Sequence, residues 1–463
     1  MVERSQRIRE RYYLFLIRCL FLLGLVLVFV GLVVNATFFE QFVSYDGVLE
    51  EATKQLILYV QMGLVTVGIV LCLVGRSLDG VSSRVKEFVI NSSLFLLSAF
   101  VVLLFIEMGM RFVSPSATVF SVVGTDPAVF ESSDIIPWTL KPNASERFVA
   151  LDFDTTVSIN SFGLRDKERQ INKDKNVHRI LIVGDSFTYG FGVNNDESYP
   201  AVIERELNEK IYDKRFEVWN AGFASGYTAD TFFVFLREKG MRFNPDLILV
   251  GVFLENDILD FLKNKYVFDD SGKLTRVVSD FYCVEEGHLR RDCDQRKKTQ
   301  LAVVSHAVRR FLLGNSRIYS YVVTKLGIIQ SMDSNPVFDK KFSSSMVENF
   351  DKFFHYIGEI KNVADSRNID FGLILLPGKS SVNEFWDVYQ KGHPCADRDK
   401  PRRLISDYCK KNKIVCLDVW PYFINASDSK RAYFEHDAHW SKEGNERGGK
   451  IIADLLIKNK LIQ

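Results

Sequence analysis

From Arg179 to the C-terminus, short apolar stretches of strand length alternate with longer amphipathic ones. The apolar stretches read RILIVG, FEVWNAG, DLILVGVF, FGLILLPG and IVCLDVWP. Between them, SYPAVIERELNEKI, ADTFFVFLREKG and SMVENFDKFFHYIGEIKNVADS place apolar residues at helical spacing. Strands that alternate with helices predict a parallel sheet with helices on both faces. In such sheets the functional site lies at the carboxyl ends of the strands.

The first predicted strand ends at Gly184, Asp185 and Ser186. A serine hydroxyl is a weak nucleophile unless a base removes its proton and a third group orients that base. The segment YFEHDAHWSKEGN near the C-terminus offers both, because Asp437 and His439 are two residues apart and project to the same side of an extended loop. We therefore expect Ser186 to be a nucleophile and Asp185 to hold the turn. The alternative for Ser186 is a helix N-cap.

Residues after the second and third strands are candidates to stabilise an oxyanion, which acyl transfer requires. Gly226 lies in NAGFASGYT, where a glycine lets a backbone N–H approach a ligand closely, and Gly222 competes for this role. Asn256 lies in LVGVFLENDILD and has an amide donor. The alternative for each is an ordinary turn residue.

The segment GDSFTYG resembles the first block of the SGNH (GDSL-type) hydrolase family. That family is named for a serine, a glycine, an asparagine and a histidine in four blocks, and the matching positions are Ser186, Gly226, Asn256 and His439. The resemblance implies that Ser186 is the nucleophile, His439 the general base and Asp437 its orienter. It also implies an oxyanion hole made by the Ser186 and Gly226 backbone N–H groups and the Asn256 side chain.

The resemblance covers roughly residues 150 to 460, including NSFGLRDKE and HWSKEGN. It implies a flavodoxin-like three-layer α/β/α sandwich with a five-stranded parallel sheet. Two positions depart from the family pattern. Many members place the aspartate three residues before the histidine, where this chain has His436, and the third block carries Leu254 in place of a glycine.

Three apolar runs precede this domain, at about 19–39, 55–75 and 88–106. Each has about 20 residues, the length that a helix needs to cross roughly 30 Å of hydrocarbon. Arginines precede the first run, acidic residues dominate the next loop, and basic residues return before the third run. By the positive-inside rule, the N-terminus is cytoplasmic and the chain after about residue 112 lies outside the cytoplasm, as a multi-pass membrane protein. A cleaved signal peptide is the alternative for the first run.

The expected organisation is a membrane anchor at 1–112, a connector with short strands at 113–177 and a catalytic domain at 178–463. An insertion at about 259–345, with a helical segment in SRIYSYVVTKLGII, is interpreted as a cap beside the site or as packing without a catalytic role. An oxidising compartment would permit Cys283–Cys293 and Cys395–Cys409 bridges, which spacing alone cannot establish.

The leading hypothesis is a membrane-anchored serine esterase that acts outside the cytoplasm through an acyl-enzyme. Its expected substrates are O-acetyl groups on envelope polysaccharide or lipid esters. One alternative is an O-acetyltransferase, which would need a multi-span partner to deliver the acyl donor. Another is a non-catalytic envelope scaffold on the same fold. The chain's net charge of +1 gives no sign of a nucleic-acid partner, and no Cys or His spacing supports zinc, so no cofactor or metal is expected.

Overall fold

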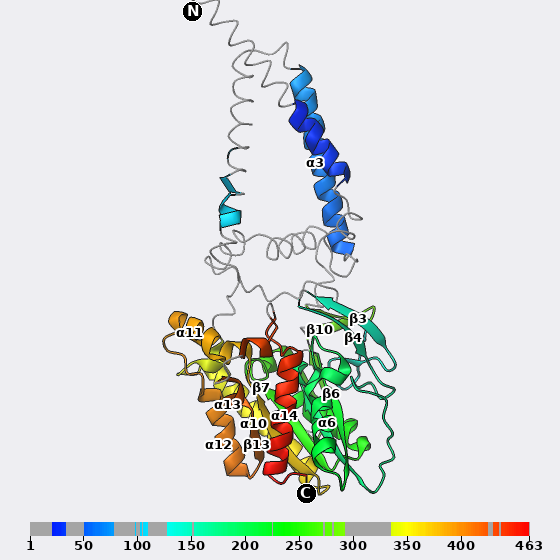
Figure 1. Ribbon diagram of the computed structural model, residues 1–463, viewed down its shortest axis with the longest axis vertical. Coiled ribbons are helices and arrows are strands. Elements are labelled where there is room, and N and C mark those ends of the chain that lie inside the picture. Colours follow the sequence, from blue (N-terminus) through cyan, green and yellow to red (C-terminus); the bar gives the residue numbers. More distant parts are fainter. Residues whose placement is uncertain are drawn as a thin grey trace, which may run out of the picture. The chain divides into compact units, whose positions relative to one another are not determined.

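The computed structural model describes residues 21–33, 51–77, 98, 102–103, 105–109, 127–150, 152–224, 226–271, 274–279, 282–291, 335–424, 429–434 and 437–462. These residues fall into two units, one with the described residues up to 109 and one with those from 127 onward. In Figure 1 the second unit holds the sheet and its helices.

The first unit contains a helix over residues 21–33 and α3 (Glu51–Ser77), which covers the second predicted span. The two helices approach closely, because a Cβ at Gly24 would lie 2.7 Å from the Gly68 carbonyl oxygen. Within the part of the chain that the structure describes, no helix combines the length and hydropathy needed to cross a membrane. Most of the third predicted span, 88–106, lies outside the described residues. The three spans stay a prediction.

The second unit is built on one five-stranded sheet in the order β13-β12-β7-β5-β6, and every neighbouring pair is parallel. All five strands coincide with the predicted ones. Seven of the eight residues of β5 and all seven of β7 are buried, so these strands require a continuous apolar run. The strands are β5 (Val177–Gly184), β6 (Arg215–Gly222), β7 (Leu247–Phe253), β12 (Asp370–Leu376) and β13 (Val415–Asp418).

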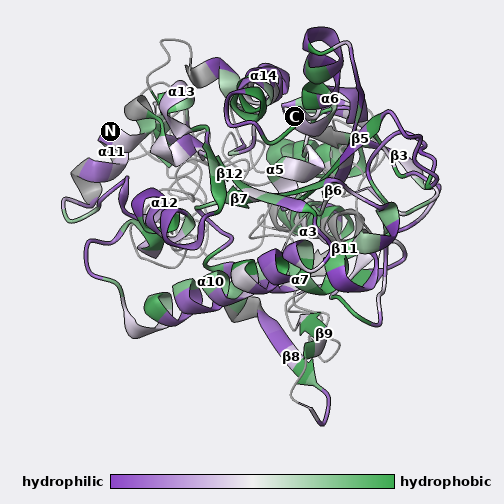
Figure 2. Ribbon diagram, turned by 90° about the horizontal axis from the view of Figure 1, so that it is seen from below, coloured by the Kyte–Doolittle hydropathy of each residue, from purple (hydrophilic) through white to green (hydrophobic). Residues whose placement is uncertain are grey.

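Helices cover both faces of this sheet (Figure 2), which confirms the predicted α/β architecture. On one face, α6 packs against α14; on the other, α7 packs against α10, with α12 beside them. The segments predicted as helices correspond to α6, α7 and α10, whereas α12 and α14 were not predicted. The helices are α5 (Ser186–Tyr189), α6 (Tyr199–Lys210), α7 (Ala229–Glu238), α10 (Ser344–Asp365), α11 (Asn383–Gly392), α12 (Lys400–Asn412), α13 (Trp420–Ile424) and α14 (Lys442–Lys458).

Short antiparallel hairpins and 3₁₀ turns complete the second unit. The hairpins are β1 (Phe130–Glu131) with β2 (Thr139–Leu140), β3 (Ser145–Ala150) with β4 (Phe153–Ser158), β8 (Asn264–Phe268) with β9 (Leu274–Ser279), and β10 (Tyr282–Glu285) with β11 (His288–Arg291). The 3₁₀ turns are η2 (Asn195–Glu197), η3 (Gly240–Phe243), η4 (Asp260–Lys263), η6 (Pro336–Phe338), η7 (Lys379–Ser381) and η8 (Ser429–Ala432).

The first two hairpins belong to the predicted connector, and Trp138 and Phe148 place them in the same core as α7 and α10. The other two hairpins belong to the predicted insertion. Its predicted helix at 316–329 lies outside the described residues, and the role of the insertion as a cap stays a prediction.

The cysteines of the second unit differ in part from what their spacing allowed. Cys395 and Cys409 are both free thiols, so the bridge considered between them is not formed. Cys409 is buried on the inner face of α12, whereas Cys395 is exposed ahead of that helix. Cys283 is disulfide-bonded to a partner outside the described residues, so its pairing with Cys293 stays a prediction.

Candidate active site

Ser186 lies at the turn between the central strand β5 and the short helix α5. The turn is tight, because a Cβ at Gly184 would lie 2.0 Å from the Thr188 hydroxyl oxygen. Asp185 is the N-cap of α5, and its Oδ1 accepts a hydrogen bond from the Phe187 backbone N–H at 3.0 Å. Asp185, not Ser186, is therefore the capping residue, and within this turn the Ser186 hydroxyl makes only a long hydrogen bond to Asp185 Oδ2, at 3.4 Å.

The Ser186 hydroxyl lies 2.7 Å from His439 Nε2, across 253 positions of sequence. On the other side of the ring, His439 Nδ1 lies 2.5 Å from Asp437 Oδ1. The same carboxylate oxygen accepts the His439 backbone N–H at 2.8 Å. With the Nδ1–H tautomer, the imidazole donates to Asp437 and accepts the serine proton at Nε2. The structure thus joins the three residues that the sequence selected into one hydrogen-bonded line.

Burial and neighbouring charges shift the pKa values of His439 and Asp437. Burial alone would lower the pKa of His439, but the charge and hydrogen bond of Asp437 outweigh it, and the nearby Asp185 adds to them, so the pKa is raised. Burial would likewise raise the pKa of Asp437, yet His439 and the cation of Lys379 bring it below its usual value. The His439 side chain keeps 21% of its surface exposed, so a substrate can reach it.

Aromatic rings hold the imidazole from the side of the nucleophile turn. Phe191 stacks on His439 with ring centroids 4.4 Å apart and 28° between the planes, and Phe187 lies 5.1 Å away. The loop that carries Phe191 is held in turn by Arg165, which is buried and donates to the carbonyl oxygens of Tyr189, Gly190 and Val193. Arg165 belongs to NSFGLRDKE, a segment that the sequence singled out without giving this arginine a role.

The two oxyanion candidates follow the strands that flank β5. Gly226 lies beyond β6 with φ +72°, and Asn256 lies beyond β7. The competing Gly222 already donates its N–H to Asn220 Oδ1 at 2.9 Å, which leaves Gly226 as the better candidate. Asn256 Oδ1 is buried and has no hydrogen-bond partner among the described residues. The amide end is therefore not tied to the fold through this oxygen.

Lys379 is a site residue that the sequence analysis did not identify. It follows β12 in the 3₁₀ turn η7, and its Nζ donates to the Phe434 carbonyl oxygen at 2.7 Å, in the loop that carries Asp437 and His439. The only signal in the sequence was a charged residue directly after a predicted strand. Among the described residues, no group of three or more His, Cys, Asp or Glu side chains could hold a metal ion. The expectation that catalysis needs no cofactor stays a prediction.

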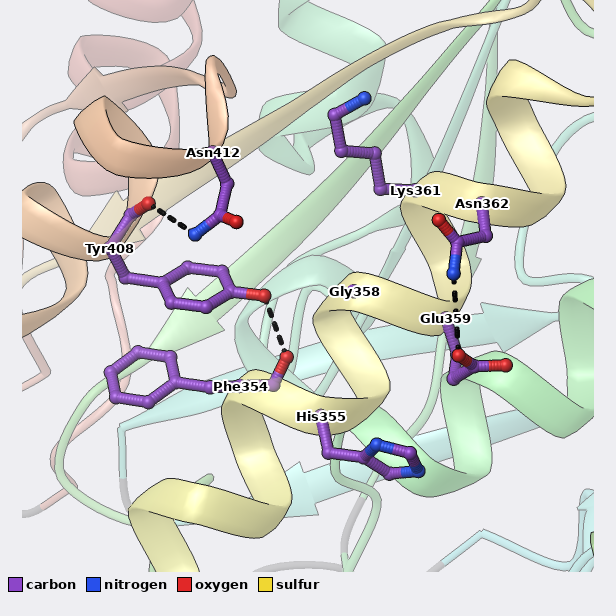
Figure 3. Close-up of a pocket in the computed structure, with 8 residues that line it drawn as sticks. All are labelled: Phe354, His355, Gly358, Glu359, Lys361, Asn362, Tyr408 and Asn412. Atoms are coloured by element: carbon purple, nitrogen blue, oxygen red, sulfur yellow. Dashed lines mark hydrogen bonds between the residues drawn. The ribbon is translucent and has the colours of Figure 1, made fainter.

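A separate cavity of about 440 Å³ lies between α10 and α12 (Figure 3). Both helices lead into the amino ends of the strands that follow them, β12 and β13. The cavity therefore lies towards the amino ends of the strands, whereas Ser186 lies at their carboxyl ends. Two of its polar side chains are paired within its walls: the Tyr408 hydroxyl donates to the Phe354 carbonyl oxygen, and the Asn412 amide donates to the Tyr408 carbonyl oxygen, both at 2.8 Å. The cavity plays no part in the arrangement around His439.

No family model matches the sequence, and no curated protein matches it. Among solved structures, a lipase/acylhydrolase from Enterococcus faecalis is 13% identical, with 61% of this chain and 96% of that one covered and a TM-score of 0.32. A GDSL-like lipase from Bacteroides thetaiotaomicron is 12% identical over 63% and 91%, with a TM-score of 0.30. A two-domain esterase active on acetylated mannans is 12% identical over 62% and 50%, with a TM-score of 0.33. At these identities and TM-scores the likeness does not establish the family, and the chemistry has to follow from Ser186, His439 and Asp437 themselves.

Proposed function

We propose that this chain is a serine acyl-ester hydrolase of the SGNH type. The observation that carries the proposal is the hydrogen-bonded line from Ser186 through His439 to Asp437, with separations of 2.7 Å and 2.5 Å. A buried carboxylate, an imidazole held by it and a hydroxyl on the other ring nitrogen are the parts of an activated serine nucleophile. The four-block resemblance supports the same assignment.

In the proposed reaction, Ser186 Oγ attacks the ester carbonyl carbon while His439 Nε2 takes the hydroxyl proton. Asp437 stabilises the resulting imidazolium and keeps Nδ1 protonated. Collapse of the tetrahedral intermediate breaks the ester C–O bond, and His439 returns the proton to the leaving alcohol. Water then attacks the acyl-serine by the same route, which releases the carboxylic acid and restores the free enzyme.

The negative oxygen of the tetrahedral intermediate needs hydrogen-bond donors fixed in advance. We assign this role to the backbone N–H groups of Ser186 and Gly226 and to the amide of Asn256. Their origin on β5 and on the two strands that pair with it supports the assignment, because the carboxyl ends of adjacent parallel strands meet at one edge.

Hydrolysis of an activated acetyl ester tests this proposal. Purified full-length protein should hydrolyse 4-nitrophenyl acetate, and Ser186→Ala should reduce the rate at least about 1,000-fold because no acyl-enzyme can form. A parallel reaction contains an acetyl acceptor glycan. Release of acetate without acetylated glycan supports a hydrolase. Transfer of the acetyl group to the glycan with little release of acetate would instead indicate a transferase. Absence of any serine-dependent turnover would contradict both.

We further propose that the N-terminal apolar segments anchor the catalytic unit at a membrane, on its extracytoplasmic side. In the first unit, most of the large apolar side chains of residues 21–33 and 57–73 are exposed, and Leu22, Phe29 and Leu73 are each at least 59% exposed. Two side-chain hydrogen bonds join these helices: Gln61 Nε2 donates to the Gly31 carbonyl oxygen at 2.8 Å, and Cys72 Sγ donates to the Phe21 carbonyl oxygen at 3.6 Å. Close glycine contacts and internally satisfied polar groups are typical of helices that pack in lipid. Such an anchor would favour O-acetyl groups on envelope polysaccharide, or lipid esters, as substrates.

The exposed thiol of Cys395 offers a test of this location. In intact cells whose outer barrier is permeable to small reagents, a membrane-impermeant maleimide should label Cys395 without lysis. Cys395→Ser serves as the control for labelling at other thiols. Labelling that requires disruption of the cytoplasmic membrane would contradict the extracytoplasmic location.

A further inference from the structure

Lys379 is a buried cation next to the loop that carries Asp437 and His439. Its ammonium is held by backbone groups of this loop. The residue is only 4% exposed. Its ammonium donates to the Phe434 carbonyl oxygen at 2.7 Å and lies 3.4 Å from the Asp437 carbonyl oxygen. The ring of Phe385 lies 5.1 Å from the ammonium. Burial of a lysine is costly, so its position calls for a specific role.

The loop that Lys379 contacts, between Tyr433 and Trp440, is closed by hydrogen bonds between its own two ends. Tyr433 and Trp440 form an antiparallel bridge at its two ends, and the Phe434 N–H donates to the His439 carbonyl oxygen at 3.1 Å. The loop is also bonded to the segment that follows β12, because the Tyr433 hydroxyl donates to the Pro377 carbonyl oxygen at 2.8 Å. The positions of Asp437 and His439 relative to Ser186 therefore depend on contacts with the segment that follows β12.

The same 3₁₀ turn, η7, also reaches the loop that follows β7. The Ser381 hydroxyl donates to Glu255 Oε1 at 2.9 Å, and Glu255 directly precedes Asn256. The turn is closely packed there, because a Cβ at Gly378 would lie 2.1 Å from that carboxylate oxygen. One turn of three residues thus contacts the acid–base loop through Lys379 and the oxyanion-candidate loop through Ser381.

The charge of Lys379 matters as well as its hydrogen bonds. It is among the causes that hold the pKa of Asp437 below its usual value, against the effect of burial. Among the described residues, the ionisable groups near this part of the site include His439 on the same loop, Glu255 after β7 and Asp185 next to Ser186. Arg398 donates to the Ser381 carbonyl oxygen at 3.5 Å.

We propose that Lys379 is a positioning residue of the active site, which fixes the Asp437–His439 loop against the end of β12 and places a positive charge beside the Asp437–His439 pair. The inference rests on the proposed function, since it assigns His439 the role of base. It goes beyond that function because Lys379 belongs to none of the four blocks.

Charge and hydrogen bonding can be separated by the choice of substitution. Lys379→Gln removes the charge and keeps a donor for the loop carbonyls, Lys379→Met removes both, and Lys379→Arg keeps both. Removal of a nearby positive charge makes protonation of the imidazole easier, so the pKa of His439 should rise. Since the base must be neutral, the acid limb of the kcat/KM profile should then move to higher pH.

The experiment measures kcat/KM for an activated acetyl ester between about pH 5 and pH 9. It also measures the His439 titration by NMR, which does not require turnover. For Lys379→Gln and Lys379→Met we expect both the acid limb and the His439 titration to shift upward by about half a pH unit or more, so that kcat/KM on the acid limb falls by about threefold or more. Lys379→Arg should keep the wild-type midpoint. Lys410→Met, at a lysine whose side chain is 80% exposed, is the matched control.

Unchanged midpoints in either folded neutral variant would overturn the proposal. So would an equal loss of activity in Lys379→Arg and Lys379→Gln without a shift, which indicates a role in packing alone. Thermal unfolding identifies the neutral variants that fold, and one of the two is sufficient for the test. A wild-type protein without turnover would contradict the proposed function, and the NMR titration would still decide whether Lys379 controls the ionisation of His439.

Discussion

Two groups of carboxyl side chains lie in the site: Asp437, on the loop with His439, and the buried pair Asp185 and Asp257, which follow β5 and β7. Both groups are held away from water, yet the pKa values move in opposite directions. Burial raises the pKa of Asp185 to about 6, with His439 opposing the rise. Burial and the neighbouring Asp185 raise that of Asp257 well above its usual value. The pKa of Asp437 is lowered instead.

The partners account for this difference. The Asp437 carboxylate accepts both an imidazole N–H and a backbone N–H, and the Lys379 ammonium lies 3.4 Å from the backbone carbonyl oxygen of the same residue. Asp257 has a backbone N–H at one oxygen, from Phe253 at 2.9 Å, while its Oδ1 has no partner among the described residues. An unpaired buried oxygen favours the protonated carboxyl. The comparison shows that the surroundings of Asp437 favour the ionised carboxylate, whereas those of Asp185 and Asp257 favour the protonated carboxyl group.

The largest effect should follow from Asp437→Asn. The amide would donate to His439 Nδ1 and so favour the tautomer with a proton on Nε2, which cannot accept the serine proton. We expect kcat to fall by about 1,000- to 10,000-fold with little loss of fold. Ester turnover measures the effect, with Asp407→Asn, at a side chain that is 73% exposed, as the control. Activity within about tenfold of wild type would mean that Asp437 does not orient the base.

Asp185→Asn should have a smaller effect of a different kind. The amide oxygen can still accept the Phe187 N–H, so the cap of α5 remains. The negative charge of Asp185, which helps to raise the pKa of His439, is lost. The acid limb of kcat/KM should therefore move to lower pH, with a rate at neutral pH within about tenfold of wild type. A shift to higher pH would show that Asp185 does not act on His439 through its charge.

Asp257→Asn should change turnover least, by about twofold or less, because the protonated carboxyl and the amide are similar in shape and charge. Its effect should be on stability against pH. A group whose pKa is higher in the folded state than in the unfolded state stabilises the fold below the unfolded value, and this contribution is lost as pH rises through the folded value. The contributions of Asp185 and Asp257 to the stability of the wild-type protein should thus be lost as pH rises from about 4 towards neutral.

Urea unfolding at several pH values measures this slope. The slope should be shallower in Asp257→Asn than in wild type, because one of the two carboxyl groups no longer titrates. If Asp257→Asn leaves the pH dependence of the unfolding free energy unchanged, or lowers kcat strongly, the proposed difference between Asp437 and the pair Asp185 and Asp257 is contradicted.

The sequence predicted the sheet well because its strands are buried on both faces, and RILIVG and DLILVGVF could not be mistaken for amphipathic segments. The catalytic residues could be selected because each directly follows a strand or lies in one short terminal segment. Arg165, Phe191 and Lys379 could not, because their roles depend on contacts between distant segments, such as that of Phe191 with His439. The Cys395–Cys409 pairing was wrong for the same reason, since spacing does not say that Cys409 is buried on α12 while Cys395, ahead of that helix, is exposed.

The central claim is that Ser186 is a nucleophile activated by His439. A fluorophosphonate probe tests it most directly, because it reacts with an activated serine irrespective of the natural ester. The account predicts one adduct on wild-type protein, located on Ser186 by peptide mass spectrometry, that forms more slowly as pH falls and is absent from Ser186→Ala. Wild-type protein that stays unlabelled, or an adduct that forms equally on Ser186→Ala, would contradict it.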